Sequence, residues 1–456
     1  MSKIKIFTII KTMKIAFLPI DNRPVCYTLP KLIAGIDNDI EFSMPDRKFL
    51  GDLTKQADIK ELFKWLKNLP PQDAIIMSLD TLIYGGLIPS RRCPESFEQL
   101  KSRVDILKEI LTRQNAKIYA CSSIMRISNN NYNIEEKEYW SDWGEKIFKY
   151  SCEFDKNGQA QTDVPPEILK DYLNTRERNF KINLEFLKLQ KERLIEFLVF
   201  SKDDCSPYGL NAIEARKLQK SGAFVKTGAD EIPLSLLSRS INKKLKIYPI
   251  FLEGNSKDLV SNYEDISVEN SVKGQIELAG CEVYEHDDAD ILLYINNFKN
   301  NQGEIVMKRD TKPFDGKFSA PDRPYMIADV RFANGADNYF VKEFLKNKID
   351  DKNFYGYSAW NTTANTLGSL ICGAKIKYFA AKNYNKENFL KLTVTRFLDD
   401  WAYQANIRQM LKEPDTEKLT SLMKDYENVM KNALGWETGV KYSYPWNRLF
   451  EVEIWI

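Results

Sequence analysis

Residues 223–239, AFVKTGADEIPLSLLSR, predict a short buried strand that runs directly into a helix. Asp230 and Glu231 stand at the junction of the two elements. Ligands in α/β proteins bind at the carboxyl ends of the strands, so an acidic pair at this position is a candidate site. The alternative is that Asp230 caps the helix and Glu231 lies in its first turn, where a negative charge is favourable.

The same arrangement recurs along the chain, because about nine apolar runs typical of strands end in polar residues. These runs are predicted at 14–20, 74–79, 117–124, 196–200, from 223, 245–252, 290–295, 325–328 and 354–360. Their ends carry, in order, Asp21, Asp80, Arg126, Asp203 with Asp204, Asp230 with Glu231, Glu253, Asn296 with Asn297, Asp329, and Asn361. Alternation with helices demands parallel strands and right-handed crossovers, which place all carboxyl ends on one side. We therefore expect these polar groups to converge on one face.

Two architectures satisfy this pattern. The first is an α/β body over residues 13–380, mainly of parallel strands, that forms a (β/α) barrel-like structure with a helical insertion at about 134–195. A helical C-terminal region, residues 381–456, would pack back on this body. The alternative is two doubly wound domains with the break near Lys244. The barrel-like body is favoured because the polar strand ends continue through both halves.

The composition excludes several classes of protein. The 66 basic and 64 acidic residues leave no large excess of charge with which to hold nucleic acid or an anionic membrane. Seven scattered cysteines without a CxxC pair argue for a reducing compartment and against a structural zinc site. The opening apolar run is too short for a signal peptide, and no later segment has the length of a membrane span. We therefore expect a cytoplasmic protein; its oligomeric state is left open.

Several longer motifs carry a resemblance to a known family. They are DNRPV (21–25), SLDTLIYGGLIPSR (78–91), GADE (228–231), NGAD (334–337), GYSAWNTTANTLG (356–368) and PWNRLFE (445–451). In these motifs the chain resembles an uncharacterised bacterial domain-of-unknown-function family, number 4127, over almost its whole length. The resemblance implies a protein of one family, typical of Gram-positive bacteria, and it implies no established reaction.

A second, four-residue resemblance concerns the acidic pair itself. Gly228-Ala229-Asp230-Glu231 is similar to the Gly-Gly-Asp-Glu turn of family-20-type β-hexosaminidases. In those enzymes the acid pair positions an acetamido group and protonates the leaving oxygen. Ala229 replaces the second glycine here, and the histidine motif that surrounds the turn in those enzymes is missing.

The leading functional hypothesis is a glycan-directed hydrolase that uses paired carboxylates and needs neither a metal nor another cofactor. Glu231 is the predicted acid, Asp230 its partner, and Asp204 or Asp80 the second carboxylate. A small carbohydrate or polar metabolite would be the ligand, with Tyr357 and Trp360 as a platform for the sugar ring. The other predicted binding residues are Asp21, Asn22, Arg23, Tyr84, Arg91, Arg126, Asp203, Asp329, Asn361, Asn365, Asn447 and Arg448.

Two alternatives use the same strand ends. Carboxylate-bound Mg²⁺ or Mn²⁺ could act on a phosphorylated substrate held by Arg91, Arg92 or Arg126. The protein could also bind a sugar or polar metabolite without catalysis.

Overall fold

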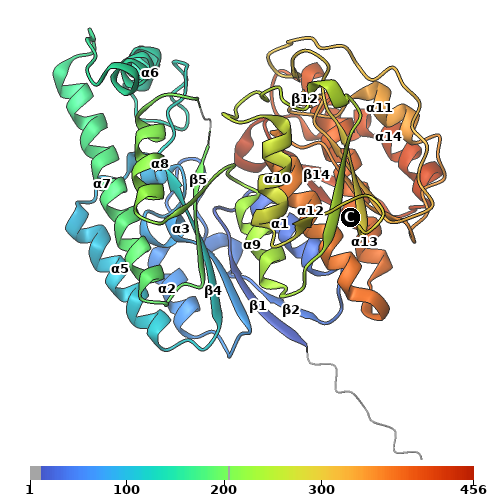
Figure 1. Ribbon diagram of the computed structural model, residues 1–456, viewed down its shortest axis with the longest axis horizontal. Coiled ribbons are helices and arrows are strands. Elements are labelled where there is room, and N and C mark those ends of the chain that lie inside the picture. Colours follow the sequence, from blue (N-terminus) through green and yellow to red (C-terminus); the bar gives the residue numbers. More distant parts are fainter. Residues whose placement is uncertain (1–11, 204–205) are drawn as a thin grey trace, which may run out of the picture.

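The protein is an α/β structure with two parallel sheets that lie in two neighbouring lobes (Figure 1). The computed structural model describes residues 12–203 and 206–456. The first sheet contains β1 (Met13–Leu18), β2 (Ile40–Ser43), β3 (Ala74–Ser78), β4 (Lys117–Ile124), β5 (Phe197–Lys202) and β6 (Phe224–Thr227). The second contains β7 (Lys246–Phe251), β8 (Glu282–Val283), β9 (Ile291–Asn296), β11 (Tyr325–Asp329) and β13 (Phe354–Ser358). Two short pairs complete the strands: β10 (Gly303–Glu304) with β12 (Phe332–Ala333), and β14 (Lys441–Ser443) with β15 (Glu453–Trp455).

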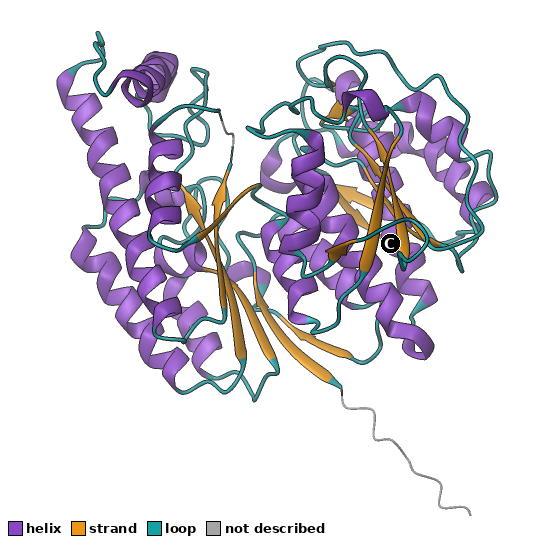
Figure 2. Ribbon diagram, viewed as in Figure 1, coloured by secondary structure: helices purple, strands orange, loops and turns teal. Residues whose placement is uncertain are grey.

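Helices flank both sheets (Figure 2). Those of the first half are α1 (Pro24–Ala34), α2 (Ile59–Lys67), α3 (Leu79–Ile83), α4 (Pro89–Arg92), α5 (Phe97–Thr112), α6 (Trp140–Asn157), α7 (Pro166–Lys191), α8 (Leu210–Lys220) and α9 (Ile232–Ser240). Those of the second half are α10 (Val268–Leu278), α11 (Asn338–Phe344), α12 (Thr363–Ala380), α13 (Lys386–Arg396) and α14 (Thr416–Leu434). A π-helical segment, η4 (Phe397–Gln404), continues α13.

Both sheets have the same strand order. The first runs β2-β1-β3-β4-β5-β6, and the second, read from its other edge, runs β8-β7-β9-β11-β13. Counted within each half, both therefore follow the order 2-1-3-4-5, with a sixth strand added to the first sheet. In this doubly wound order the chain leaves the first strand in both directions, and the crevice between the first and third strands is where ligands bind.

The prediction of a closed, barrel-like body is therefore wrong. The prediction of an α/β protein with parallel strands is confirmed. Within residues 12–203 and 206–456 the strands form open sheets and no closed barrel. Closure requires each strand to pair with its predecessor in the chain, whereas β1 pairs with both β2 and β3. The first sheet thus grows in two directions and leaves β2 and β6 at opposite edges. The helix α9 then carries the chain to the second sheet.

The core follows from alternating side chains along the buried strands. Ile15 and Phe17 of β1 belong to an apolar cluster on one face of the first sheet, while Ala16 and Leu18 belong to a cluster on the other. This alternation is the period of two that an extended strand imposes. The cluster that includes Ile15 and Phe17 continues through α1, α9 and α12 into the second sheet. The two halves therefore share this cluster, while the other face of each sheet has an apolar cluster of its own.

All nine predicted strands are present, with ends within a few residues of the predicted ones. The pattern missed β2, β8, β10 and β12, which are short or only half-buried. The predicted helical stretch after residue 134 contains α6 and α7; α7 packs beside α5, and α6 packs beside α8 (Figure 1).

Candidate functional site

A cavity of about 230 Å³ lies where strand ends of both sheets meet. The loops after β1, β3, β4, β5, β6 and β13 contribute to it, together with the C-terminal tail. Its walls consist of Arg23, Leu87, Ile88, Arg91, Arg126, Glu135, Asp203, Ala229, Asp230, Tyr263, Asn334, Asn361, Thr362, Asn365 and Phe450. Seven of the residues predicted from strand ends therefore share one cavity, namely Arg23, Arg91, Arg126, Asp203, Asp230, Asn361 and Asn365.

Asp230 is held at the cavity wall by Arg23. The Arg23 guanidinium donates from Nη2 to Asp230 Oδ1 at 2.6 Å and from Nη1 to Oδ2 at 3.0 Å. Arg23 is itself fixed by Asp21, whose carboxylate accepts from Arg23 Nε at 2.9 Å and from the Arg23 backbone at 3.0 Å. Burial raises the pKa of Asp230, and Arg23 opposes this rise. Asp21 thus supports Arg23 and does not itself line the cavity.

Glu231 turns away from the cavity although it follows Asp230 directly. Its side chain is almost fully enclosed and accepts from Ala229 N at 2.9 Å and from Gln275 Nε2 at 2.8 Å. Burial raises its pKa to about 8. A Cβ atom at Gly228 or at Gly368 would overlap with this side chain, so two glycines make the space for it. Neither acid caps α9 through its side chain, and the predicted capping role is therefore wrong.

A network of arginines and carboxylates forms the next wall. Arg126 pairs with Glu135 at 3.0 Å and with Glu136 at 2.9 Å, and its Nη1 lies 3.6 Å from Asp203. Arg91 pairs with Glu136 at 3.1 Å and also faces Asp203, at 3.9 Å. Burial alone would raise the pKa of Glu135, but Arg126, Arg91 and Arg448 hold it well below its usual value. The charges on this wall therefore balance one another.

The C-terminal tail closes the network. Arg448 donates to Glu451 at 2.8 Å and to Glu135 at 2.9 Å, and Glu451 lies 3.5 Å from Arg23. Asn447, which was predicted to bind the substrate, is exposed and does not line the cavity. Asn22 is also absent from this wall, because its side chain accepts from Trp446 Nε1 at 2.6 Å and its backbone carbonyl accepts from Arg47.

The first turn of α12 supplies amide side chains to the cavity. Asn365 Oδ1 accepts from the backbone N–H of Glu231 at 3.2 Å, which joins the turn after β6 to α12. Asn361 and Asn334 both adopt left-handed backbone conformations, with φ of 59° and 61°. Asn334 N donates to the Asn361 carbonyl at 2.8 Å. Asparagine tolerates this conformation better than other residues with a side chain, so both loops can hold their amides at the wall.

Two predicted residues after β3 are buried and do not line the cavity. Asp80 is buried and accepts from Ser122 Oγ and from Ser123 N, both at 2.8 Å, and burial raises its pKa. Tyr84 is 1% exposed, and burial raises its pKa well above the usual value. Asp80 thus joins the end of β3 to β4, and neither residue lines the cavity.

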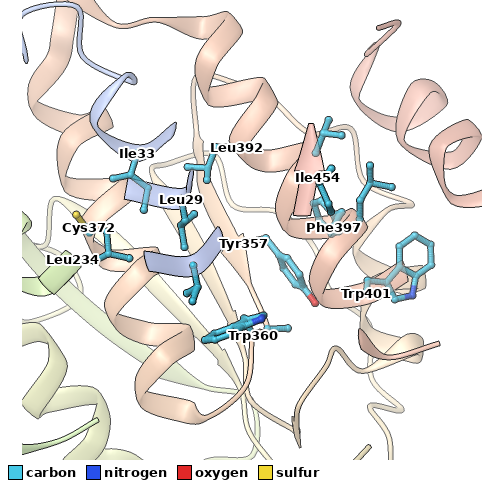
Figure 3. Packing of buried hydrophobic residues seen from close by; sticks show 14 of the residues in the cluster. Leu29, Ile33, Leu234, Tyr357, Trp360, Cys372, Leu392, Phe397, Trp401 and Ile454 are labelled. Atoms are coloured by element: carbon cyan, nitrogen blue, oxygen red, sulfur yellow. The ribbon is translucent and has the colours of Figure 1, made fainter. Parts of the chain in front are cut away.

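The predicted sugar platform belongs to the apolar core (Figure 3). Tyr357 is 2% exposed and stacks on Phe397 with 4.5 Å between the ring centroids. Its hydroxyl donates to Asp329 at 3.1 Å, and Asp329 is itself fully buried. Trp360 is 4% exposed in the same cluster. Core packing and ligand binding can both place a pair of aromatic residues at a strand end, and here core packing accounts for Tyr357 and Trp360.

Other residues of the site carried too little signal in the sequence. Asp204 lies outside the described residues. Glu135, Tyr263 and Phe450 line the cavity and were not predicted, because Glu135 opens a predicted helical stretch and the other two belong to loops. The motif PWNRLFE drew attention to the C-terminal tail, but nothing in the sequence showed that Glu451 would lie next to Arg23. No group of three or more His, Cys, Asp or Glu side chains within 12–203 and 206–456 is arranged to hold a metal ion.

The comparisons with known proteins concern the whole chain. In the part of the chain that the structure describes, no helix combines the length and apolar character of a membrane span. A search of curated proteins gives no match. One family model matches residues 15–455, so the chain belongs to the family described as "Protein of unknown function (DUF4127)".

Proposed function

We propose that the protein is a hydrolase that acts on a glycan or a similar polyhydroxylated substrate in this cavity. One observation carries the proposal: the carboxylates of Asp203, Asp230 and Glu135 share a wall with the amides of Asn361 and Asn365. Carboxylates can transfer protons and attack a glycosidic carbon, and amides can bind several hydroxyl groups in a fixed orientation. A concave site with a few convergent polar groups is typical of small-molecule enzymes.

Asp230 takes the role of the general acid in this proposal. It lines the cavity, and its burial favours the protonated form that an acid must hold before it donates. Arg23 lies close enough to stabilise the carboxylate that remains after proton transfer. Glu231 is a positioning residue instead of the acid expected from the sequence, because its carboxyl group is enclosed behind Ala229.

Asp203 takes the role of the second carboxylate. It lines the same cavity and lies 3.9 Å from Arg91 and 3.6 Å from Arg126. An ionised carboxylate can activate water or attack the sugar, depending on its distance from the acid.

The test uses a panel of chromogenic glycosides. Asp230→Asn and Asp203→Asn should each lower kcat at least about 100-fold, the usual effect of losing an acid or base. Glu231→Gln should retain at least about a tenth of the activity, since the enclosed side chain acts only through its neighbours. Glu253→Gln is the matched control, because Glu253 also follows a strand and pairs with an arginine but lies outside the cavity. Full activity of Asp230→Asn with loss of activity in Glu231→Gln would return the acid role to Glu231.

A binding protein without catalysis is the second candidate, and the charge balance of the cavity favours it. Asp230, Glu135 and Asp203 all face arginines, an arrangement that also suits a site built only to hold a polar ligand. This candidate predicts that a sugar raises the melting temperature of the wild type while no product forms during long incubation.

A further inference from the structure

A second hollow lies beside the cavity, and Tyr263 lines both. It has a volume of about 450 Å³, against about 230 Å³ for the cavity. Along the chain the two are also neighbours, because Arg126 lines the cavity and Ile127 lines the second hollow. Asn129, Asn130 and Asn262 contribute amide groups to it. The proposed catalytic cavity therefore adjoins a larger hollow across Tyr263.

One wall of the second hollow is fixed on α6. The carbonyl of Asn130 lies so close to this helix that a Cβ atom at Gly144 would overlap with it. Asn131 Oδ1 accepts from the backbone N–H of Glu145 at 3.0 Å, in the same turn of the helix. Phe148, one turn further along, lines the hollow. The glycine thus lets the asparagine-rich loop rest directly on α6.

The opposite wall is fixed on the second half of the chain. Asn262 donates from its backbone to Gln302 Oε1 at 2.7 Å and from its side chain to the Gly303 carbonyl at 3.3 Å. Glu304 accepts from Asn334 Nδ2 at 2.6 Å, and Asn334 lines the cavity. Met307, three residues beyond Glu304, lines the second hollow. The segment that carries Met307 is therefore tied to both Asn262 and the cavity wall.

The chemistry of the second hollow suits sugar rings. Tyr263 and Met307 are 39% and 60% exposed, so both side chains are accessible to a ligand. An accessible aromatic ring can pack against the apolar face of a sugar, while neighbouring amides bind its hydroxyl groups. Walls held in place by several hydrogen bonds reduce the entropy that is lost when a flexible ligand binds.

We propose that the two hollows bind one linear oligosaccharide, with its reacting bond in the cavity and further sugar units in the second hollow against Tyr263. This inference rests on the proposed function, which it deepens from a glycan to a chain of several sugar units. It predicts that the protein prefers oligosaccharides to single sugars.

The experiment measures binding and turnover on the same probes. A glycan array that carries each sugar type as chains of one to six units would be incubated with the wild type, and both retention and product release would be measured. Retention and turnover should rise at least about tenfold from one unit to three or four, as expected when one further ring is buried.

Variants then locate the effect. Met307→Ala should remove part of the gain from chain length and leave the turnover of single-unit glycosides within about twofold, because Met307 lines the second hollow and not the cavity. Tyr263→Ala should remove more of that gain. Met410→Ala is the matched control, because Met410 is 59% exposed but lines neither hollow. Melting temperatures of the variants would show that each is folded.

The outcomes separate the two proposals. Turnover that does not depend on chain length would overturn the oligosaccharide inference and leave the hydrolase proposal intact. Retention that rises with chain length and depends on Tyr263, without any product, would overturn the hydrolase and keep the extended site. Absence of both retention and turnover across the array would overturn both.

Discussion

The two sheets have the same strand order, but the crevices at their switch points differ. After β1 and β3 the polar residues lie at or beneath the cavity that contains Arg23 and Asp230. After β7 and β9 the corresponding residues bind one another, because the fully enclosed Arg331 donates to Asn296 at 3.0 Å and to Glu253 at 3.0 Å. The strand order thus brings polar groups together in both halves, and the loops decide whether space for a ligand remains.

The largest effect should come from removing the arginine of the first crevice. Arg23→Met leaves Asp21 and Asp230 buried without their partner, while Glu451 keeps Arg448. This loss should cost about 3–5 kcal/mol in the free energy of unfolding. Urea unfolding followed by tryptophan fluorescence measures this loss.

Arg331→Met in the second crevice is the counterpart of Arg23→Met in the first. It should destabilise less, because its ion pairs involve two carboxylates, Glu253 and Asp337, and Glu253 is partly exposed. It should also leave catalysis unchanged when the fraction of folded protein is taken into account. A loss of kcat in Arg331→Met would mean that the second crevice also takes part in the reaction.

The next effect concerns pH and the enclosed acid at the joint of the two halves. Glu231 keeps its proton in the folded protein up to about pH 8, whereas the unfolded chain releases it at about pH 4.3. Between these values the unfolded state binds fewer protons, so the free energy of unfolding falls as the pH rises. The contribution of Glu231 should amount to about 2 kcal/mol between pH 6 and pH 8.

Urea unfolding of Glu231→Gln over the same pH range tests this assignment. The variant should lose stability less steeply than the wild type. A residual slope of the same sign should remain, because burial also raises the pKa of Glu264, Asp329 and Asp400 to about 7. Parallel curves for the variant and the wild type would show that Glu231 is ionised in the folded protein.

A smaller effect tests the space that holds Glu231 between the halves. In Gly368→Ala the new Cβ atom would overlap with the Glu231 side chain and lie 2.9 Å from Ser235 Oγ, which should cost about 1–3 kcal/mol. Combining it with Glu231→Ala should remove only part of this cost, because the Glu231 Cβ atom, 2.8 Å away, and Ser235 Oγ remain in place.

Gly373→Ala is the control on the same helix. Its Cβ atom would lie 3.6 Å from Leu392, an ordinary contact, so the higher helix propensity of alanine should stabilise the protein by up to about 1 kcal/mol. Equal costs at both glycines would contradict the packing of Glu231 against α12.

The smallest effect distinguishes Asn361, which lines the cavity, from Asn296, which lies in the second crevice. Asn361→Ala removes an amide from the cavity wall and should raise KM about threefold to tenfold. It should also cost about 1 kcal/mol of stability, because alanine tolerates the left-handed backbone at this position less well than asparagine. Asn296→Ala, in the second crevice, deprives Asp329 and Arg331 of a buried partner and should lower the free energy of unfolding by about 1–3 kcal/mol. It should leave KM unchanged, because Asn296 does not line the cavity. An unchanged KM for Asn361→Ala would remove this side chain from the proposed binding site.

The sequence predicts the strands of this fold better than their order. Runs such as residues 117–124 are apolar and short, so their extended conformation follows from local pattern alone. The pairing of β1 with both β2 and β3 depends on contacts between distant segments, and β2 is too polar to be recognised beforehand. The choice between a barrel and two sheets depended on that pairing.

The same distinction applies to the site. Strand ends identified Arg23, Asp203 and Asp230 because a parallel sheet gathers such residues without regard to loop structure. The direction of a side chain could not be predicted in this way. Asp230 and Glu231 are adjacent in the sequence, yet only Asp230 faces the cavity. That difference results from Gly228 and Gly368, which admit one carboxyl group into the interior.

The apolar cluster that passes from the first sheet through α9 and α12 to the second has a consequence for folding. Because each lobe covers buried surface of the other, neither has a complete interior of its own. Heat or denaturant should therefore melt both lobes in a single cooperative transition. Two polypeptides produced by cutting the gene between α9 and β7 should be insoluble apart and recover native structure only when they are refolded together.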